Sequence, residues 1–153
     1  MQMQVKTIQQ MYDWTILFHT QMAANFFSVR ELLGEHNTQL VDYCTKYEKK
    51  LAEDLIGFKA ITTINTLDTY CYEYFAENPE LLNFTDLDRN TQLDEQAIQG
   101  YLSVQHQKVI NAYEYLEGKT QTADGKEKLG QILQLEYQGL KQMVQSINRH
   151  IDM

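Results

Sequence analysis

Four polar residues that could bind a metal ion interrupt the apolar pattern of this sequence: His19, Glu48, His106 and Glu136. Each lies on or beside a stripe of apolar residues, where a buried polar group left unpaired costs about 1–3 kcal/mol. The histidine and the glutamate are 29 residues apart in the first half of the chain and 30 apart in the second. Two imidazoles and two carboxylates that converge would form a suitable ligand set for iron, manganese or zinc.

The periodicity of the chain places these residues near the middle of helices. From Val5 to Leu33, side chains on one stripe recur every three and four residues, with His19 at the midpoint, which is the spacing of one helix face. A helix of that length would be about 43 Å long, as in one member of a helical bundle. Similar patterns predict four long helices, at about 4–33, 38–64, 91–117 and 125–151.

Turn residues indicate where these helices begin and end. Gly34 is expected in the left-handed conformation just past the first helix, and 37–38 (Asn-Thr) are expected to cap the second. Asn90 or Thr91 is expected to begin the third helix, and Asp124 the fourth. The short connection after residue 33 makes the first two helices an antiparallel hairpin.

The region at about 65–90 is expected to be a long crossover between two hairpins. The β-branched and polar run at 62–66 weakens a helix, and Pro79 ends the segment that follows. The aromatic segment at 70–75 is expected to form a short helix that covers one end of the bundle or provides a surface for a homodimer. The sequence therefore predicts one all-α domain over 1–153, a four-helix bundle of two antiparallel hairpins.

Composition limits the fold and the partners. Seven glycines and one proline are too few for the turns of an all-β fold, and 43% hydrophobic residues suffice for a core. The net charge of -8, with thirteen scattered basic residues, argues against nucleic acid and against an anionic membrane surface as a partner.

No apolar run reaches the roughly 18 residues of a membrane span and no signal peptide is evident, so we expect a cytoplasmic protein. Cys44 and Cys71 are expected to be small buried hydrophobic residues.

The spacing of the polar residues resembles the ferritin-like, rubrerythrin-type four-helix bundles, especially small bacterial proteins of that superfamily. In that pattern the first and third helices each carry a Glu, and the second and fourth each carry Glu-x-x-His. Glu48 and Glu136 match the glutamates of the two Glu-x-x-His motifs, whereas His19 and His106 occupy the other two glutamate positions. The two motif histidines are replaced by residues of other types, Leu51 and Gly139.

Two functional hypotheses follow. In the first, the bundle binds iron, manganese or zinc through His19, Glu48, His106 and Glu136, with an open position next to Gly139. The resemblance then implies a role in metal handling or oxidative stress. In the second, the metal has been lost and the chain is a metal-free, non-enzymatic bundle that acts as a dimeric interaction or scaffold protein.

Other residues leave the choice between these hypotheses open. In a metal-free bundle His19 could hydrogen-bond either Glu48 or Asp54, because a helical stripe can be drawn through each. The stripe through Tyr47 and Asp54 would rotate Glu48 outward and make it a solvated flank residue. His36 lies in a predicted turn and His150 near the C-terminus, so both are expected to be solvated. The sequence contains no recognisable nucleophile motif and no phosphate-binding glycine loop, so it gives no support for a hydrolase, kinase or dehydrogenase and identifies no substrate.

Overall fold

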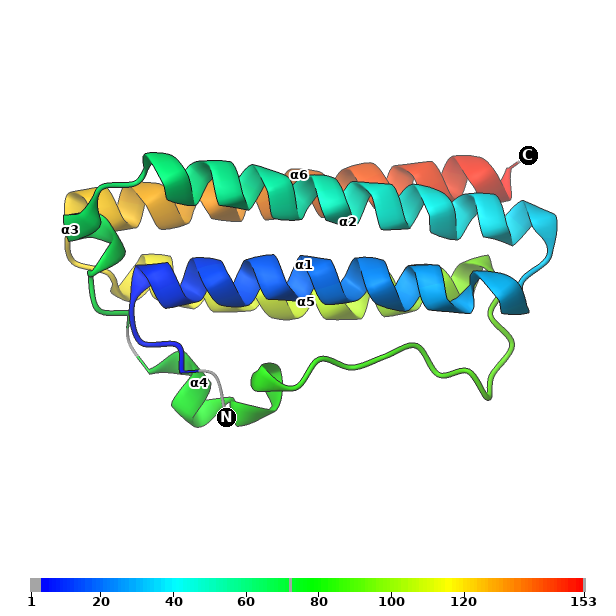
Figure 1. Cartoon of the computed structure of the whole chain (residues 1–153), viewed down its shortest axis with the longest axis horizontal. Helices are drawn as coiled ribbons and strands as arrows, with labels where there is room; N and C mark the ends of the chain where they lie inside the picture. Colours follow the sequence, from blue (N-terminus) through cyan, green and yellow to red (C-terminus); the bar gives the residue numbers. More distant parts are fainter. Residues whose placement is uncertain (1–3, 72, 153) are drawn as a thin grey trace.

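Four long helices lie side by side in the computed structural model, which describes residues 4–71 and 73–152 (Figure 1). Their bounds are α1 Ile8–Val29, α2 Glu35–Ile61, α5 Glu95–Lys119 and α6 Ala123–Ile151. Helix α1 packs mainly against α2, and α5 mainly against α6, each pair running antiparallel through a short turn. The predicted all-α bundle is therefore confirmed, with its apolar core between the four helices.

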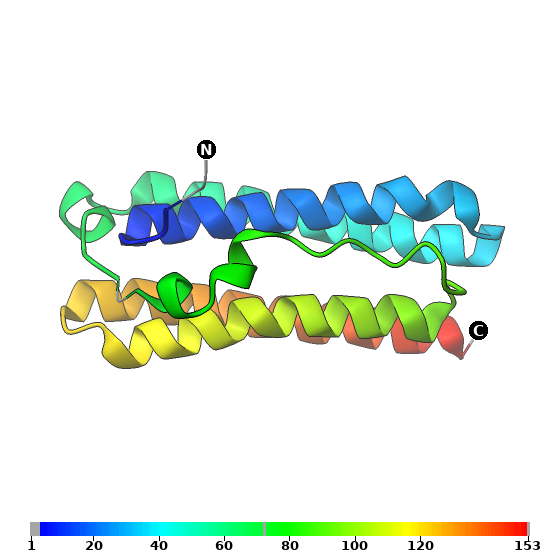
Figure 2. The same ribbon diagram turned by 90° about the horizontal axis from the view of Figure 1, so that it is seen from below.

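The connection between the two helix pairs runs the length of the bundle, along the outer side of the layer formed by α1 and α5 (Figure 2). It contains two single-turn helices, α3 (Ile64–Leu67) and α4 (Tyr74–Glu77), and the 3₁₀ turn η2 (Pro79–Leu82). The buried indole of Trp14 in α1 donates a hydrogen bond of 3.0 Å to the carbonyl oxygen of Leu81. Phe75 packs edge-on against the same indole at 4.8 Å, so one residue of α1 anchors two parts of the crossover.

The turn between α1 and α2 differs from the expectation. Helix α1 begins at Ile8 rather than near residue 4, because Thr7 and Gln10 form a reciprocal capping box there. The 3₁₀ turn η1 (Arg30–Leu32) follows α1. Gly34 then has a φ of -70° and is the N-cap of α2, so its predicted left-handed conformation is wrong. Helix α2 consequently begins at Glu35, three residues earlier than predicted.

The predicted start signals of the last two helices are also wrong by a few residues. Asp94, rather than Asn90 or Thr91, caps α5 by accepting a hydrogen bond from the backbone nitrogen of Ala97 at 2.8 Å. Thr122, rather than Asp124, caps α6. In both cases several oxygen-bearing side chains lie within one turn of the helix start, and only the folded backbone selects which one caps. The break after α2 falls at Thr62, within the 62–66 run that predicted it.

The aromatic segment at 70–75 packs partly inward, and the short helix expected over all of it begins only at Tyr74. Phe75 and Cys71 are buried, and the Tyr74 ring lies 4.9 Å from the ring of Tyr115 in α5. Tyr70 is exposed, and Tyr72 lies outside the described residues. Among the helices at 4–71 and 73–152, none is long and apolar enough to cross a membrane.

Candidate metal centre

One polar side chain from each long helix meets its counterparts at the centre of the bundle. His19 comes from α1, Glu48 from α2, His106 from α5 and Glu136 from α6, and all four are completely buried. Each lies on the buried stripe of its helix, so the periodicity that builds the core also directs these polar groups inward. The structure therefore brings together all four residues that the sequence singled out.

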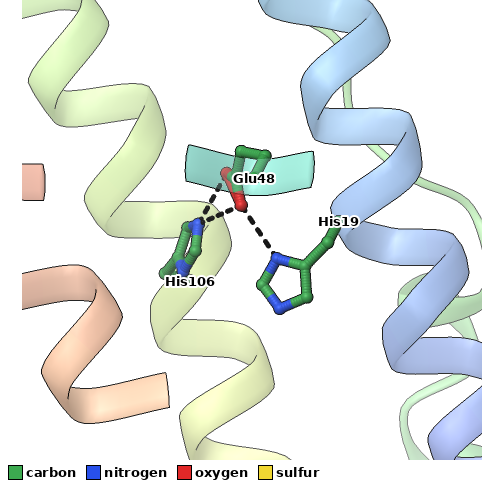
Figure 3. Close-up of side chains that lie close together, drawn as sticks. All are labelled: His19, Glu48 and His106. Atoms are coloured by element: carbon green, nitrogen blue, oxygen red, sulfur yellow. Dashed lines mark hydrogen bonds and ion pairs between the residues drawn. The ribbon is translucent and has the colours of Figure 1, made fainter. Parts of the chain in front are cut away.

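The carboxylate of Glu48 lies between the two imidazoles (Figure 3). Its Oε1 is 2.8 Å from Nδ1 of His19, and its Oε2 is 2.8 Å from Nε2 of His106. On the opposite side, Nε2 of His19 is 2.7 Å from Oε1 of Glu136. His19 is thus held between two carboxylates, one at each ring nitrogen.

These contacts determine the protonation of His19 in the absence of metal. An ionised carboxylate only accepts hydrogen bonds, so a histidine that bonds two of them must carry a proton on both nitrogens. Burial lowers the pKa of His19, but the charges and hydrogen bonds of Glu136 and Glu48 outweigh burial and raise the pKa to about 10. Burial likewise raises the pKa of Glu48, and the two histidines overcome it and lower the pKa to about 2.

The fourth side of the cluster is incompletely bonded. Nδ1 of His106 and Oε2 of Glu136 are 3.8 Å apart, which is too long for a hydrogen bond. Both atoms are buried and have no hydrogen-bond partner among the described residues. Unpartnered buried polar atoms are uncommon in folded proteins and often mark a bound ion or water.

The geometry also shows which neighbours contribute nothing to the cluster. Asp54 bonds Lys50 at 3.0 Å on the partly exposed side of α2, so Glu48 rather than Asp54 faces His19. The expected open position next to Gly139 is wrong, because a Cβ built on Gly139 would meet the Leu51 side chain at 3.2 Å. Leu51 therefore packs onto the Gly139 backbone, at the two positions where the related pattern has its motif histidines.

A second cluster of possible metal ligands, not expected from the sequence, lies at one end of the bundle. His36 at the start of α2, Glu95 at the start of α5 and His150 near the end of α6 lie close enough for one donor atom from each to fall within 4.8 Å of the others. The signal was present, because in a bundle with this chain direction those three helix ends share one end of the molecule. His36 is exposed, as expected, whereas His150 is only partly exposed and its Nε2 is buried.

The bundle of two antiparallel helix pairs joined by a long crossover has a ferritin-like fold. A similar solved structure comes from Thermotoga maritima and is described as a ferritin-like diiron-carboxylate protein, an assignment that its description marks as provisional. The two chains share 14% sequence identity and superpose with a TM-score of 0.59 over 93% of this chain and 95% of the other. No family model and no curated protein matches this sequence. The likeness establishes the fold.

Proposed function

We propose that the protein binds one transition-metal ion at mid-bundle through His19, Glu48 and His106, with Glu136 as a supporting carboxylate. The observation that carries the proposal is convergence: one donor atom from each of the three residues lies within 4.8 Å of the others in a completely buried layer. Two imidazoles and a carboxylate suit iron, manganese and zinc. The ferritin-like fold and the diiron-carboxylate description of the similar structure support iron as the first candidate.

The donor set fits one ion rather than two. Ferritin-like di-iron sites use four glutamates and two histidines, whereas this layer has two of each. Leu51 and Gly139 pack together where the further histidines would be needed. The next carboxylates along α2, Glu53 and Asp54, are exposed and partly exposed, and Asp54 pairs with Lys50.

Glu136 would orient His19 rather than bind the ion. Its Oε1 lies 2.7 Å from Nε2 of His19, so it keeps the proton on that nitrogen and leaves Nδ1 to face Glu48. A carboxylate behind a metal-binding histidine fixes the ring and increases its basicity. The ion would displace the proton on Nδ1, because a ligating histidine is neutral.

A bound ion would supply Lewis-acid chemistry and, for iron or manganese, electron transfer. The Phe18 ring lies edge-on to both imidazoles, at 5.1 Å from His19 and 5.6 Å from His106. This apolar cover keeps bulk water away from the layer. We therefore assign the protein to metal handling or defence against oxidants, with the buried layer retaining its ion.

Elemental analysis tests the proposal directly. Tag-free protein carrying His36→Gln and His150→Gln is loaded anaerobically with Fe²⁺, Mn²⁺ or Zn²⁺ in separate samples, desalted and measured by plasma mass spectrometry. These two substitutions remove the partly exposed histidines, so the count reports the buried layer. We expect about one equivalent of metal, lost on Glu48→Gln and retained by the exposed control Glu53→Gln, with helix content checked by circular dichroism.

A metal-free bundle is the second candidate, and a specific observation favours it. His19 already bonds both carboxylates, at 2.8 and 2.7 Å, so a proton can satisfy much of the layer without an ion. In that case the cluster is a structural polar layer and the protein acts as a non-enzymatic interaction protein. If the His36→Gln/His150→Gln protein contains only background metal after loading with each of the three ions, the metal proposal is excluded and the metal-free bundle remains.

A further inference from the structure

The ends of three helices meet at the end of the bundle that carries the C-terminus (Figure 1). There the imidazole rings of His36 and His150 stack with centroids 3.7 Å apart and an interplanar angle of 28°. Nε2 of His36 also lies 3.5 Å from Oε1 of Glu95. Two histidines and a carboxylate from distant parts of the sequence are thus gathered in one place.

A second observation at this cluster points to an absent ligand. Nε2 of His150 is buried and has no hydrogen-bond partner among the described residues. A buried ring nitrogen left unpaired destabilises the fold, and stacking places this one beside a second imidazole rather than beside a hydrogen-bonding partner. A cation that accepts this lone pair would satisfy it.

We propose that His36, Glu95 and His150 form a second, separate site for a divalent ion, zinc by preference. Imidazole and carboxylate donors without a thiolate suit zinc, nickel and copper(II). Zinc ligands lie about 2.0–2.2 Å from the ion and hence about 3.4 Å from one another in a tetrahedron. The donor atoms are within 4.8 Å of one another, so they must move closer by up to about 1.4 Å on binding. The His36 side chain is 51% exposed, which gives its ring room to leave the stack on His150.

This end site is independent of the mid-bundle layer. His36 and Glu48 are twelve residues apart on α2, which places them about 18 Å apart along the helix. The end site lies at the surface, so its fourth position is filled by solvent and its ion exchanges readily. The ion would tie the starts of α2 and α5 to the end of α6, a helix terminus that is otherwise expected to fray.

A Zn²⁺ titration of the tag-free, full-length protein tests this site. The ring resonances of the four histidines are followed by NMR, and affinity is measured by calorimetry. We expect the His36 and His150 resonances to shift together on addition of Zn²⁺. His150→Gln and Glu95→Gln should each weaken binding at this site at least about tenfold, whereas Glu53→Gln should leave it unchanged. These substitutions lie outside the core, so folding is preserved.

Thermal unfolding provides a second readout. Zn²⁺ should raise the Tm of the parent protein, and this increase should be reduced in His150→Gln. A titration in which only His19 and His106 respond would overturn the proposal and leave the mid-bundle site intact. Equal Zn²⁺ affinity in the parent, His150→Gln and Glu95→Gln proteins would overturn it as well.

Discussion

At the scale of single residues, Glu48 is the group on which the mid-bundle layer depends, because its two oxygens contact both buried histidines. In metal-free protein, Glu48→Gln removes the negative charge and turns an amide toward ring N–H groups. Removing one partner of a buried ion pair costs about 3–5 kcal/mol. We expect a loss of that size in the free energy of urea unfolding, followed by the fluorescence of the single, buried Trp14.

The matched control for this prediction is Glu53→Gln, on the exposed side of the same helix. Its effect should stay within about 0.5 kcal/mol. A loss below about 1 kcal/mol for Glu48→Gln would contradict the buried ion pair, since even one unpaired polar group costs that much.

The stability of the metal-free protein should depend on pH through the same layer. The pKa of His19 is about 10 in the folded chain against 6.5 for an unperturbed histidine, so its contribution is complete below pH 6.5 and is lost as pH rises through 10. The pKa of Glu48 is about 2 against 4.5, so its contribution is complete above pH 4.5 and is lost as pH falls through 2. Stability should therefore be greatest between pH 4.5 and 6.5.

Urea unfolding in the presence of a chelator measures this profile. The His36→Gln/His150→Gln protein is the appropriate background, because it removes the other two histidines. A profile that stays flat from pH 7 to about 9 would contradict a doubly protonated His19. Bound metal should reduce the alkaline loss, because the ion replaces the proton that is otherwise lost.

At the scale of helices, glycines test how closely α2 and α6 approach each other. A Cβ on Gly139 would meet Leu51 at 3.2 and 3.3 Å, whereas one on Gly57 would meet nothing within 4 Å. Gly57→Ala should therefore stabilise the protein by about 0.5–1 kcal/mol, the helix preference for alanine. Gly139→Ala should not be stabilising, because overpacking against Leu51 should lower the free energy of unfolding by about 1 kcal/mol or more.

Denaturant unfolding of the two variants under the same conditions gives the comparison. When Leu51→Ala has removed the obstructing side chain, Gly139→Ala should add the helix preference for alanine, so the double variant should be more stable than Leu51→Ala alone. Equal stabilisation by Gly57→Ala and Gly139→Ala would show that α2 and α6 lie further apart at this point than the structure has them.

At the scale of the whole molecule, the homodimer stays a prediction, and the structure changes where we expect its surface. The aromatic segment at 70–75 packs partly inward, whereas α1 and α2 expose three large apolar side chains, Leu17, Phe27 and Ile56. A groove of about 450 Å³ lies between these two helices, lined by Phe27 and three alanines, with Thr20, Lys49 and Glu53 as its polar residues. Exposed apolar patches of this kind often mark protein interfaces.

Sedimentation equilibrium tests the dimer. The parent chain should associate, and Phe27→Lys should shift it toward monomer by burying a charge in the interface. Val104→Lys is the control, because Val104 is comparably exposed but lies on α5. A strict monomer at high concentration would exclude the dimer altogether.

The sequence alone was sufficient for the helical bundle and for naming the four candidates of its polar layer. Apolar spacing of three and four residues places His19, His106 and Glu136 on buried helix faces, whereas Glu48 lay beside the predicted stripe of its helix and could also have been solvated. It was sufficient as well for the break at Thr62, since a run of β-branched residues acts locally. Helix caps were less predictable, because several side chains within one turn can cap and small differences in backbone geometry select among them.

Only the tertiary structure decided which side chains meet. Periodicity gives the rotation of a residue about its own helix, but contact between helices also depends on their axial offset, which no local pattern contains. That offset packs Leu51 onto Gly139. The rotation of α2 in the bundle, for which the sequence allowed two stripes, turns Glu48 rather than Asp54 toward His19. The offset also brings His36 and His150 together across more than a hundred residues of sequence, because the crossover returns the chain to the end of the bundle where α2 begins.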